Sequence, residues 1–328
     1  MAIGSGLGAQ VGIAAESSYG VYTAPTRFVE FTSEGLKFQK TTAQSSGIAA
    51  GRLVDRSSRR VVTTVGAAGE LAMEVFTRGM GVLFQALMGS TVAPEQQEET
   101  DAYLQEHLLA DTFGKSLTVQ KGVPLTTGVV SDFSVLGCKI ISAEFSCEVG
   151  GMLTVSFELD GKTVDETQTL AAPSYPPMAP FHFGQMTLRT GVHGAEVARS
   201  GIRKVSVKFE RPQATERYYA NAGGLKAEPI SNDKVKITGS LETDYTETTL
   251  ADLFVSDAAT SMVWEFAGAE IDEDYPELFR ITLPAIHLDE STPVVDGPDV
   301  VKPNFSFTGL DDGVNPIRLD YQSTDTTL

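Results

Sequence analysis

The sequence predicts a mainly β protein built as two tandem β-sandwich or barrel modules, each with one flanking α-helix. Apolar side chains alternate in short segments, as at Leu71, Met73 and Val75, which is typical of a half-buried strand. Glycine and proline interrupt these segments at intervals of roughly ten residues, as in antiparallel β domains. Several short motifs also recur, in the same order, in the second half of the chain.

The recurring motifs favour an internal duplication. Residues 35–40 read GLKFQK and residues 206–211 read SVKFER, while Gly69-Glu70-Leu71 is echoed by Gly239-Ser240-Leu241. Residues 155–161 resemble residues 305–313. Each match is weak alone, because strands draw on few residue types. Their shared order is better explained by duplication than by chance.

One helix is predicted in each half. Residues 79–88 have apolar side chains at helical spacing and end at Gly89. Residues 248–255 begin with Thr248, which can cap a helix, and place Leu250 and Phe254 on one face. Both helices follow a Gly-x-Leu strand, and this common position strengthens the case for duplication.

These patterns predict four parts of the chain. Residues 1–26 form a Gly/Ala-rich N-terminal arm, and residues 27–170 form the first module. Residues at about 91–112 have no counterpart in the second half and are interpreted as a solvated insertion. Residues 171–180 form a proline-rich linker, which should be extended and stiff, before the second module at 181–328.

The net charge of −18 is shared by both halves. Residues 1–170 carry 12 basic and 19 acidic side chains, and residues 171–328 carry 13 and 24. Binding to nucleic acid by phosphate neutralisation is disfavoured, because it requires a basic face. Two interpretations stay open: charge that keeps the protein soluble, or a surface past which a polyanion moves without sticking.

Membrane, metal and catalytic roles find no support in the sequence. The chain lacks an apolar run of about 18 residues, and its start lacks the regions of a signal peptide, so synthesis in a cytoplasm is expected. Four dispersed histidines give no zinc spacing, and no catalytic or cofactor motif is present. Cys138 and Cys147 are nine residues apart on one predicted strand, which places them on opposite faces and disfavours a disulfide.

Two long connections carry basic residues in an otherwise acidic chain, at residues 41–65 and 212–233. Loops of this length inside compact modules are usually functional. They are either ordinary surface or segments that reach neighbouring subunits and pair with acidic patches. The expected inter-subunit contacts are Arg52, Arg56, Arg59, Arg60, Arg217, Tyr218 and Tyr219.

Five segments carry a resemblance to a known family. They are GAQVGIAAE at 8–16, FTSEGL at 31–36, the loop with Gly51-Arg52, VDGPDV at 295–300 and LDDG at 310–313. Over nearly its whole length the chain resembles the tail tube proteins, or major tail proteins, of long-tailed (siphovirus-like) bacteriophages. These motifs are structural, and the family has no catalytic motif.

The resemblance implies a structural virion protein assembled in the host cytoplasm. Tail-tube-type modules would form six-module rings that stack into a tube, which conducts genomic double-stranded DNA through an acidic lumen without specific binding. Two modules per chain imply trimeric, pseudo-hexameric rings, whereas a single module would imply hexameric rings. Other tail proteins would meet the tube at its ends.

Two other functions stay open. The first is a two-domain β-sandwich adhesin or glycan-binding module of a phage tail, which would remain as discrete particles. The second is a hydrolase with an unrecognised carboxylate pair. Against these, the acidic run at 272–274 is typical of a solvated turn, and the one tryptophan, Trp264, is expected to pack in a core or interface.

Overall fold

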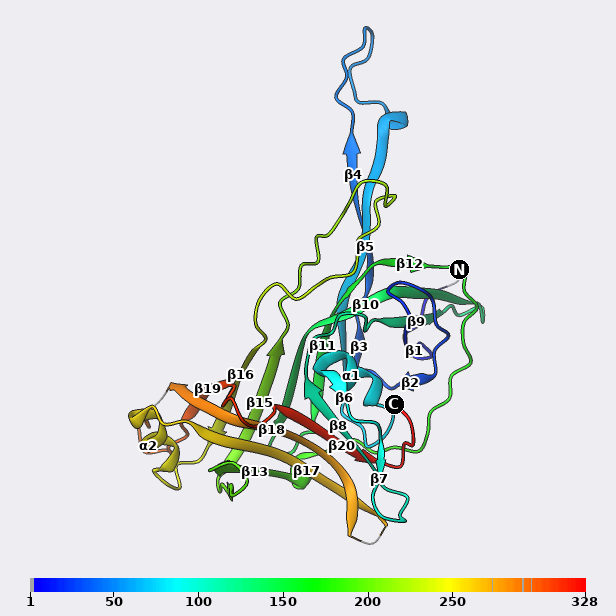
Figure 1. Cartoon of the computed structure of the whole chain (residues 1–328). Coiled ribbons are helices and arrows are strands. Elements are labelled where there is room, and N and C mark those ends of the chain that lie inside the picture. Colours follow the sequence, from blue (N-terminus) through cyan, green and yellow to red (C-terminus); the bar gives the residue numbers. More distant parts are fainter. Residues whose placement is uncertain (1–2, 273, 291, 296) are drawn as a thin grey trace.

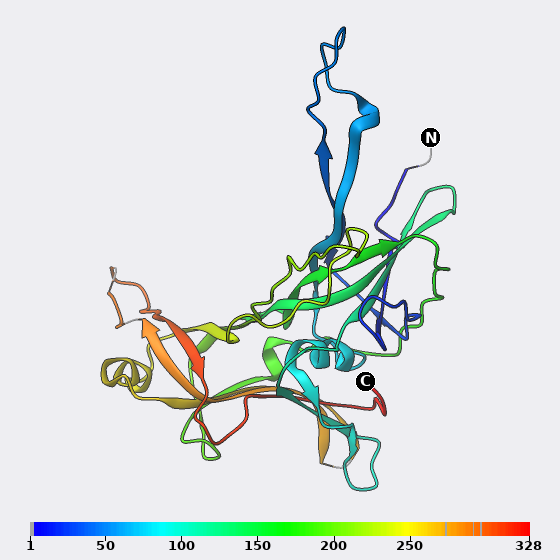
Figure 2. The ribbon, with the colours of Figure 1, turned by 45° about the horizontal axis from the view of Figure 1, so that its top comes forward.

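The computed structural model of the chain describes residues 3–272, 274–290, 292–295 and 297–328 (Figure 1). The first two residues of the predicted arm, and Asp296 of the motif at 295–300, lie outside the described residues. The described part is mainly antiparallel β structure with two short α-helices, as the sequence predicts. A long hairpin of two strands, β4 and β5, projects away from the body of the molecule (Figures 1 and 2).

A central antiparallel sheet joins the two halves of the chain. The joint is the pairing of β10 with β15, in which Ser142 lies opposite Glu210 and Glu148 lies opposite Lys204. In spatial order its eight strands are β4 (Lys37–Gln44), β5 (Arg60–Glu74), β11 (Thr154–Gly161), β10 (Val130–Glu148), β15 (Ile202–Glu210), β16 (Lys236–Thr243), β19 (Asn304–Leu310) and β18 (Tyr275–Glu290).

The first half of β10 and of β18 also belongs to a second layer of strands. Around β10 the order is β2 (Arg27–Val29), β1 (Gln10–Ala15), β9 (Leu117–Pro124), β10 and β12 (Thr163–Asp165). Around β18 it is β14 (Val197–Ala198), β13 (Met186–Gly191), β17 (Thr260–Asp272), β18 and β20 (Arg318–Ser323). Beyond β20 lie β8 (Tyr103–Leu109) and its partners β6 (Gly89–Thr91) and β7 (Glu95–Gln96), whereas β3 (Ser33–Glu34) pairs with β5.

The two helices occupy matching places but are packed differently. Helix α1 (Gly81–Met88) and helix α2 (Thr249–Ser256) each follow the second strand that their half contributes to the central sheet, β5 or β16. Each ends on a residue with a left-handed backbone, Gly89 (φ 95°) or Asp257 (φ 49°). Nearly all of α1 is buried, but in α2 only Leu250 and Ala251 are buried. The 3₁₀ helices are η1 (Ser57–Arg59) and η2 (Phe183–Gln185).

A continuous aromatic core lies between the layers. The ring centroids of Phe84 on α1 and Phe279 on β18 are 5.6 Å apart, and those of Phe145 on β10 and Phe279 are 5.4 Å apart. Trp264 on β17 is fully buried and packs on Phe266, as expected for a core residue. Side chains from both halves therefore share one core.

The segment predicted as a solvated insertion is not solvated as a whole. Within residues 91–112, strand β8 pairs with β20 along its length, and Gln105 and His107 are fully buried. The sequence misleads here because the inward-facing residues of this strand are polar, so its pattern resembles a surface segment.

The expectation that Cys138 and Cys147 lie on opposite faces is also wrong. Both are free thiols, buried in the same hydrophobic core. A β-bulge between Ile140 and Ser142 adds one residue to β10 and thereby reverses the alternation after it.

Candidate assembly surfaces

One face of the central sheet is polar and open to solvent, and it faces away from the core. Register places its residues in rows across the strands. In one row, hydroxyl side chains follow one another on five adjacent strands: Thr154, Ser146, Ser206, Ser240 and Ser306. The hydroxyls of Ser206 and Ser240 are hydrogen-bonded at 2.8 Å. Such groups bond water readily and carry no charge.

Acidic side chains outnumber basic ones on this face. Glu158 is hydrogen-bonded to Ser142 at 3.1 Å, and Glu70 is hydrogen-bonded to Ser156 at 2.5 Å. Lys208 and Glu210 form an ion pair at 2.6 Å, and each shifts the pKa of the other toward the charged form. The acids that register places here are Glu70, Glu74, Glu144, Glu148, Glu158, Glu210 and Glu242, against Lys37, Lys204, Lys208 and Lys236.

The long connection after β15, residues 211–235, is strapped to the first half of the chain. Nζ of Lys226 lies 2.7 Å from the Asp160 carboxylate, and Nζ of Lys139 lies 2.5 Å from the Glu228 carboxylate. Lys139, Lys226 and Asp160 are buried. Burial lowers the pKa of Lys139 and raises that of Asp160, against the effect of their partners. Breaking either pair would therefore leave a buried charge uncompensated.

Arg211 closes the same joint at the end of α1. Its guanidinium donates to the carbonyl oxygens of Leu87 (2.8 Å), Met88 (3.3 Å) and Ala110. A cation at this position stabilises the carbonyls that a helix leaves unpaired at its C-terminus. The Arg211 backbone N–H donates to the carbonyl of Ile141, so strand, side chain and helix meet in one place.

Among the described residues, the edge of the central sheet formed by β3 and β4 is open. Within the described residues, β3 and β4 pair with β5 on one side, and no strand pairs with their other side. Phe38 on this edge is 49% exposed, and Lys40 is exposed. An open edge with an exposed aromatic residue offers backbone donors and acceptors to another strand.

The four arginines predicted as contacts belong to the segment after β4, with Arg52, Arg56 and Arg59 in the connection and Arg60 as the first residue of β5. This connection forms the far end of the projecting hairpin (Figure 2). Arg52, Arg59 and Arg60 are exposed, and Arg56 is half-buried. Arg60 donates to Thr42 Oγ1 across the hairpin at 3.3 Å. This tip extends farther from the body than any other labelled strand (Figure 1).

The second predicted cluster is engaged within the chain. The Tyr218 hydroxyl donates to the Val65 carbonyl on β5 at 3.2 Å, and Arg217 donates to the Glu228 carbonyl. The Arg217 guanidinium lies 5.7 Å from the ring centre of Tyr219, which is 59% exposed. The structure therefore brings Arg217 and Tyr219 together and leaves Tyr219 available at the surface.

Sequence reasoning missed the residues that hold the joint, namely Arg211, Lys139, Asp160, Lys226 and Glu228. One signal was available: Lys139 stands inside an otherwise apolar strand segment, Cys138 to Ile140. A charged residue in such a segment indicates a buried ion pair.

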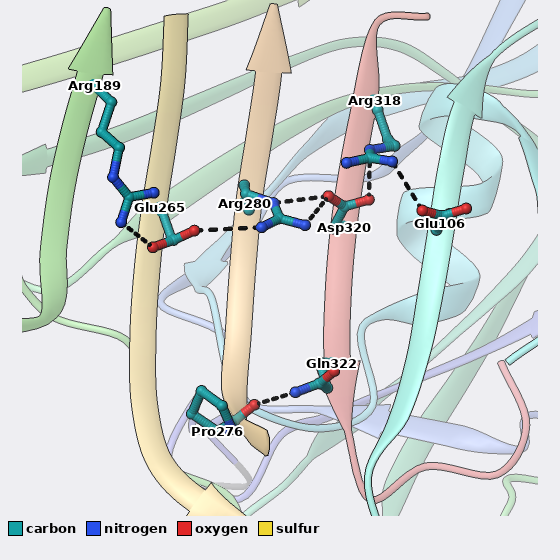
Figure 3. A network of polar contacts seen from close by, with 8 residues as sticks. All are labelled: Glu106, Arg189, Glu265, Pro276, Arg280, Arg318, Asp320 and Gln322. Carbon is teal, nitrogen blue, oxygen red and sulfur yellow. Dashed lines mark hydrogen bonds and ion pairs between the residues drawn. The ribbon is translucent and has the colours of Figure 1, made fainter. Parts of the chain in front are cut away.

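A ladder of ion pairs crosses five strands on the outer face of the second layer (Figure 3). Glu265 on β17 contacts Arg189 on β13 (3.0 Å) and Arg280 on β18 (3.5 Å). Asp320 on β20 is buried between Arg280 (2.8 Å) and Arg318 (3.0 Å). Arg318 then reaches Glu106 on β8 at 2.9 Å, which ties the segment at 103–109 to the second half.

Comparison with known families identifies the family of this chain. A family model of phage tail tube proteins matches residues 6–309. The chain belongs to the phage tail tube protein family. A search of curated proteins finds no match.

Membership of the tail tube family makes this chain a structural component of the virion tail. Within the described residues, no group of three or more His, Cys, Asp or Glu side chains could hold a metal ion. No helix of the described chain is long and apolar enough to cross a membrane. The surfaces available for a structural role are the polar sheet face, the open edge and the projecting hairpin.

Proposed function

We propose that this tail tube protein assembles into rings of three copies, and that the rings stack into a tube through which double-stranded DNA passes to the host. The observation that carries this proposal is the repeated strand order of the central sheet. The order β4-β5-β11-β10 in the first half corresponds to β15-β16-β19-β18 in the second. The second layer repeats too, with β2-β1-β9-β10-β12 corresponding to β14-β13-β17-β18-β20.

The register of these strands supports an internal duplication. Phe38 lies opposite Ala67, as Phe209 lies opposite Ile237. A β-bulge interrupts β10 between Val135 and Cys138, and the same irregularity interrupts β18 opposite Thr260 and Met262. Bulges are specific features of a fold, so their common place is difficult to explain by independent origin.

Two glycines give independent support for the internal duplication. A Cβ atom on Gly69 would lie 2.3 Å from the Gly35 carbonyl oxygen, and one on Gly239 would lie 2.2 Å from the Ser206 carbonyl oxygen. Both positions thus exclude every larger residue for the same reason. The third sequence match, by contrast, needs a shift of two residues, because Phe157 lies opposite Leu71 as Phe305 lies opposite Leu241.

A chain with two equivalent modules supports three-fold rings. The joint between β10 and β15 links module 1 to module 2, and repeating it between chains would be a head-to-tail contact that closes by rotation. Eight strands from each of three chains, 24 in all, would form one continuous sheet around a channel. If the repeat had no assembly role, rings of six chains would be the alternative.

The polar face of the central sheet is proposed to line this channel. Its carboxylates repel phosphate, and its rows of hydroxyls hold water without fixing a charge, so DNA would pass without specific binding. The projecting hairpin with Arg52, Arg56, Arg59 and Arg60 is proposed to contact an adjacent ring, and Tyr219 with Arg217 is proposed to contact a neighbouring copy. Other tail proteins would meet the same surfaces at the tube ends.

Negative-stain electron microscopy of concentrated protein tests this function. Hollow filaments with a regular axial repeat are expected. Compact particles under every condition, combined with saturable glycan binding, would instead favour a tail adhesin. No filaments and no rings at any protein concentration would contradict the assembly proposal.

A further inference from the structure

We propose that helix α2 and the adjoining end of β18 form a socket for the β3–β4 edge of a second copy, with Phe38 and Lys40 as the inserted residues. This inference rests on the proposed self-assembly and specifies its joint. Its template is present in the chain itself, where β15 and Arg211 already occupy the matching socket made by α1 and β10.

Three pairs of matching residues differ in burial in the same direction. On the inserted strand, Phe209 is fully buried, whereas its counterpart Phe38 is 49% exposed. Arg211, two residues after Phe209, is 4% exposed, whereas Lys40, two residues after Phe38, is exposed.

The third pair lies on the helix that forms the socket. Leu87, the penultimate residue of α1, is fully buried, but Val255, the penultimate residue of α2, is 73% exposed. Strand β4 and helix α2 therefore each expose an apolar residue, Phe38 or Val255, whose counterpart in the β10–β15 joint is buried. Burial of both against a second copy would remove this apolar surface from water.

The chemistry at the end of α2 suits a cation. Arg211 donates to the last carbonyls of α1, those of Leu87 and Met88. The matching carbonyls of α2 belong to Val255 and Ser256, and among the described residues no donor reaches them. The ammonium of Lys40 would take the place of the Arg211 guanidinium, as a point charge at the negative end of the helix.

The charges around this socket also differ from those of the occupied one. His287 on β18 pairs with Asp257 at 3.0 Å, beside the C-terminus of α2, and Asp289 on the same strand bonds Thr308 at 2.5 Å. The socket thus adds carboxylates to a helix C-terminus, and both attract a lysine. An incoming Lys40 would meet complementary charge before any backbone pairing forms.

A pair of variants on one strand tests the inserted residue. Phe38→Ser should raise the protein concentration needed for assembly about tenfold or more, because it removes a half-exposed aromatic group from the joint. Gln39→Ser, its neighbour on the opposite face, should assemble like the unmodified chain. Both monomers should have the same circular dichroism spectrum. Unchanged assembly by Phe38→Ser would overturn the socket even though tubes form.

Photo-crosslinking tests the position of the socket directly. With p-benzoylphenylalanine in place of Phe38, irradiated assemblies should yield crosslinks to residues 249–257 or 287–289 of another copy, identified by mass spectrometry. Crosslinks that map elsewhere in normally formed tubes would overturn the socket and leave the proposed function intact. Failure of the unmodified chain to assemble at all would overturn both proposals.

Discussion

Helices α1 and α2 have the same length and follow matching strands, yet their surroundings differ. Helix α1 is covered, and its final carbonyls are bonded by Arg211, which comes from the other half of the chain. Helix α2 has two buried residues and an exposed apolar Val255. Although their positions in the fold match, α1 is apolar on nearly every side whereas α2 carries polar residues such as Asp252 and Ser256, so the helices differ both in sequence and in what lies against them.

In the proposed assembly, one chain holds both a completed and an uncompleted copy of the same joint. In the joint within the chain, β15 pairs with β10, and two ion pairs, Lys226–Asp160 and Lys139–Glu228, hold the following loop to the first half. The matching edge, β3 and β4, has no such partner within the described residues. On this proposal, the monomer would keep its own two halves together and leave one equivalent surface at each end for assembly.

The largest effect is expected at the completed joint. Lys226→Ala would leave the Asp160 carboxylate buried without its partner, and should lower the free energy of unfolding of the monomer by about 3–5 kcal/mol. The double variant Lys226→Met with Asp160→Leu should be much closer to the unmodified protein. Urea unfolding at neutral pH measures both variants. A loss below about 1 kcal/mol for Lys226→Ala would show that the Lys226–Asp160 pair is not needed for the stability of the monomer.

Acid pH should destabilise the protein through His107 on β8, the strand that has no counterpart in the second half. Burial lowers the pKa of His107 to about 3, so the native state stays neutral while the unfolded state becomes protonated below about pH 6.5. The contribution of neutral His107 to the free energy of unfolding is fully present above about pH 6.5 and is lost as the pH falls toward 3. At pH 4 the loss is about 3 kcal/mol. His107→Gln should reduce this difference between pH 7 and pH 4 in urea unfolding, and an unchanged difference would contradict the assignment.

Matching substitutions at the two helix ends sharpen the comparison. Arg211→Ala should destabilise the monomer by about 2 kcal/mol, because it leaves buried carbonyls at the end of α1 unpaired. Lys40→Ala should change monomer stability by less than about 0.5 kcal/mol, because Lys40 is exposed there. Equal losses in thermal unfolding of the monomers would show that the two positions are not occupied and open versions of one joint.

The smallest effect on the monomer is expected at the hairpin tip. Reversing Arg52, Arg56, Arg59 and Arg60 to Glu should leave circular dichroism and unfolding of the monomer nearly unchanged, since most of these side chains are exposed. The same variant should fail to form tubes in negative-stain images. Normal tubes would refute the role given to this hairpin.

Local patterns predicted much of the fold. Alternation and glycine spacing indicated the strands, and residues 79–88 and 248–255 were placed within two residues of α1 and α2. The motifs at 35–40 and 206–211 lie on β4 and β15, each of which pairs with the strand that precedes a helix, and this supports the predicted duplication. These features depend on near neighbours in the sequence, which is why they could be predicted.

Features set by distant contacts could not be predicted. The polar residues of β8 face inward because this strand pairs with β20, far away in the sequence. The bulge between Ile140 and Ser142, which places Cys147 on the same face as Cys138, lies between β10 and the next strand β11, and the alternation of side chains did not reveal it. Arg217 and Tyr218 were predicted as inter-subunit contacts; in the structure they bond to Glu228 and Val65 of the same chain, and their contact with a neighbouring copy stays a prediction. The joint between β10 and β15, closed by Arg211, became visible only in the structure.

A cryo-EM reconstruction of the assembled tube decides whether a single interface is used twice. The prediction is a ring of three molecules, in which the β4 edge that contains Phe38 pairs with the next molecule as β15 pairs with β10. A ring of six molecules, or neighbouring molecules that touch without pairing their strands, would contradict it.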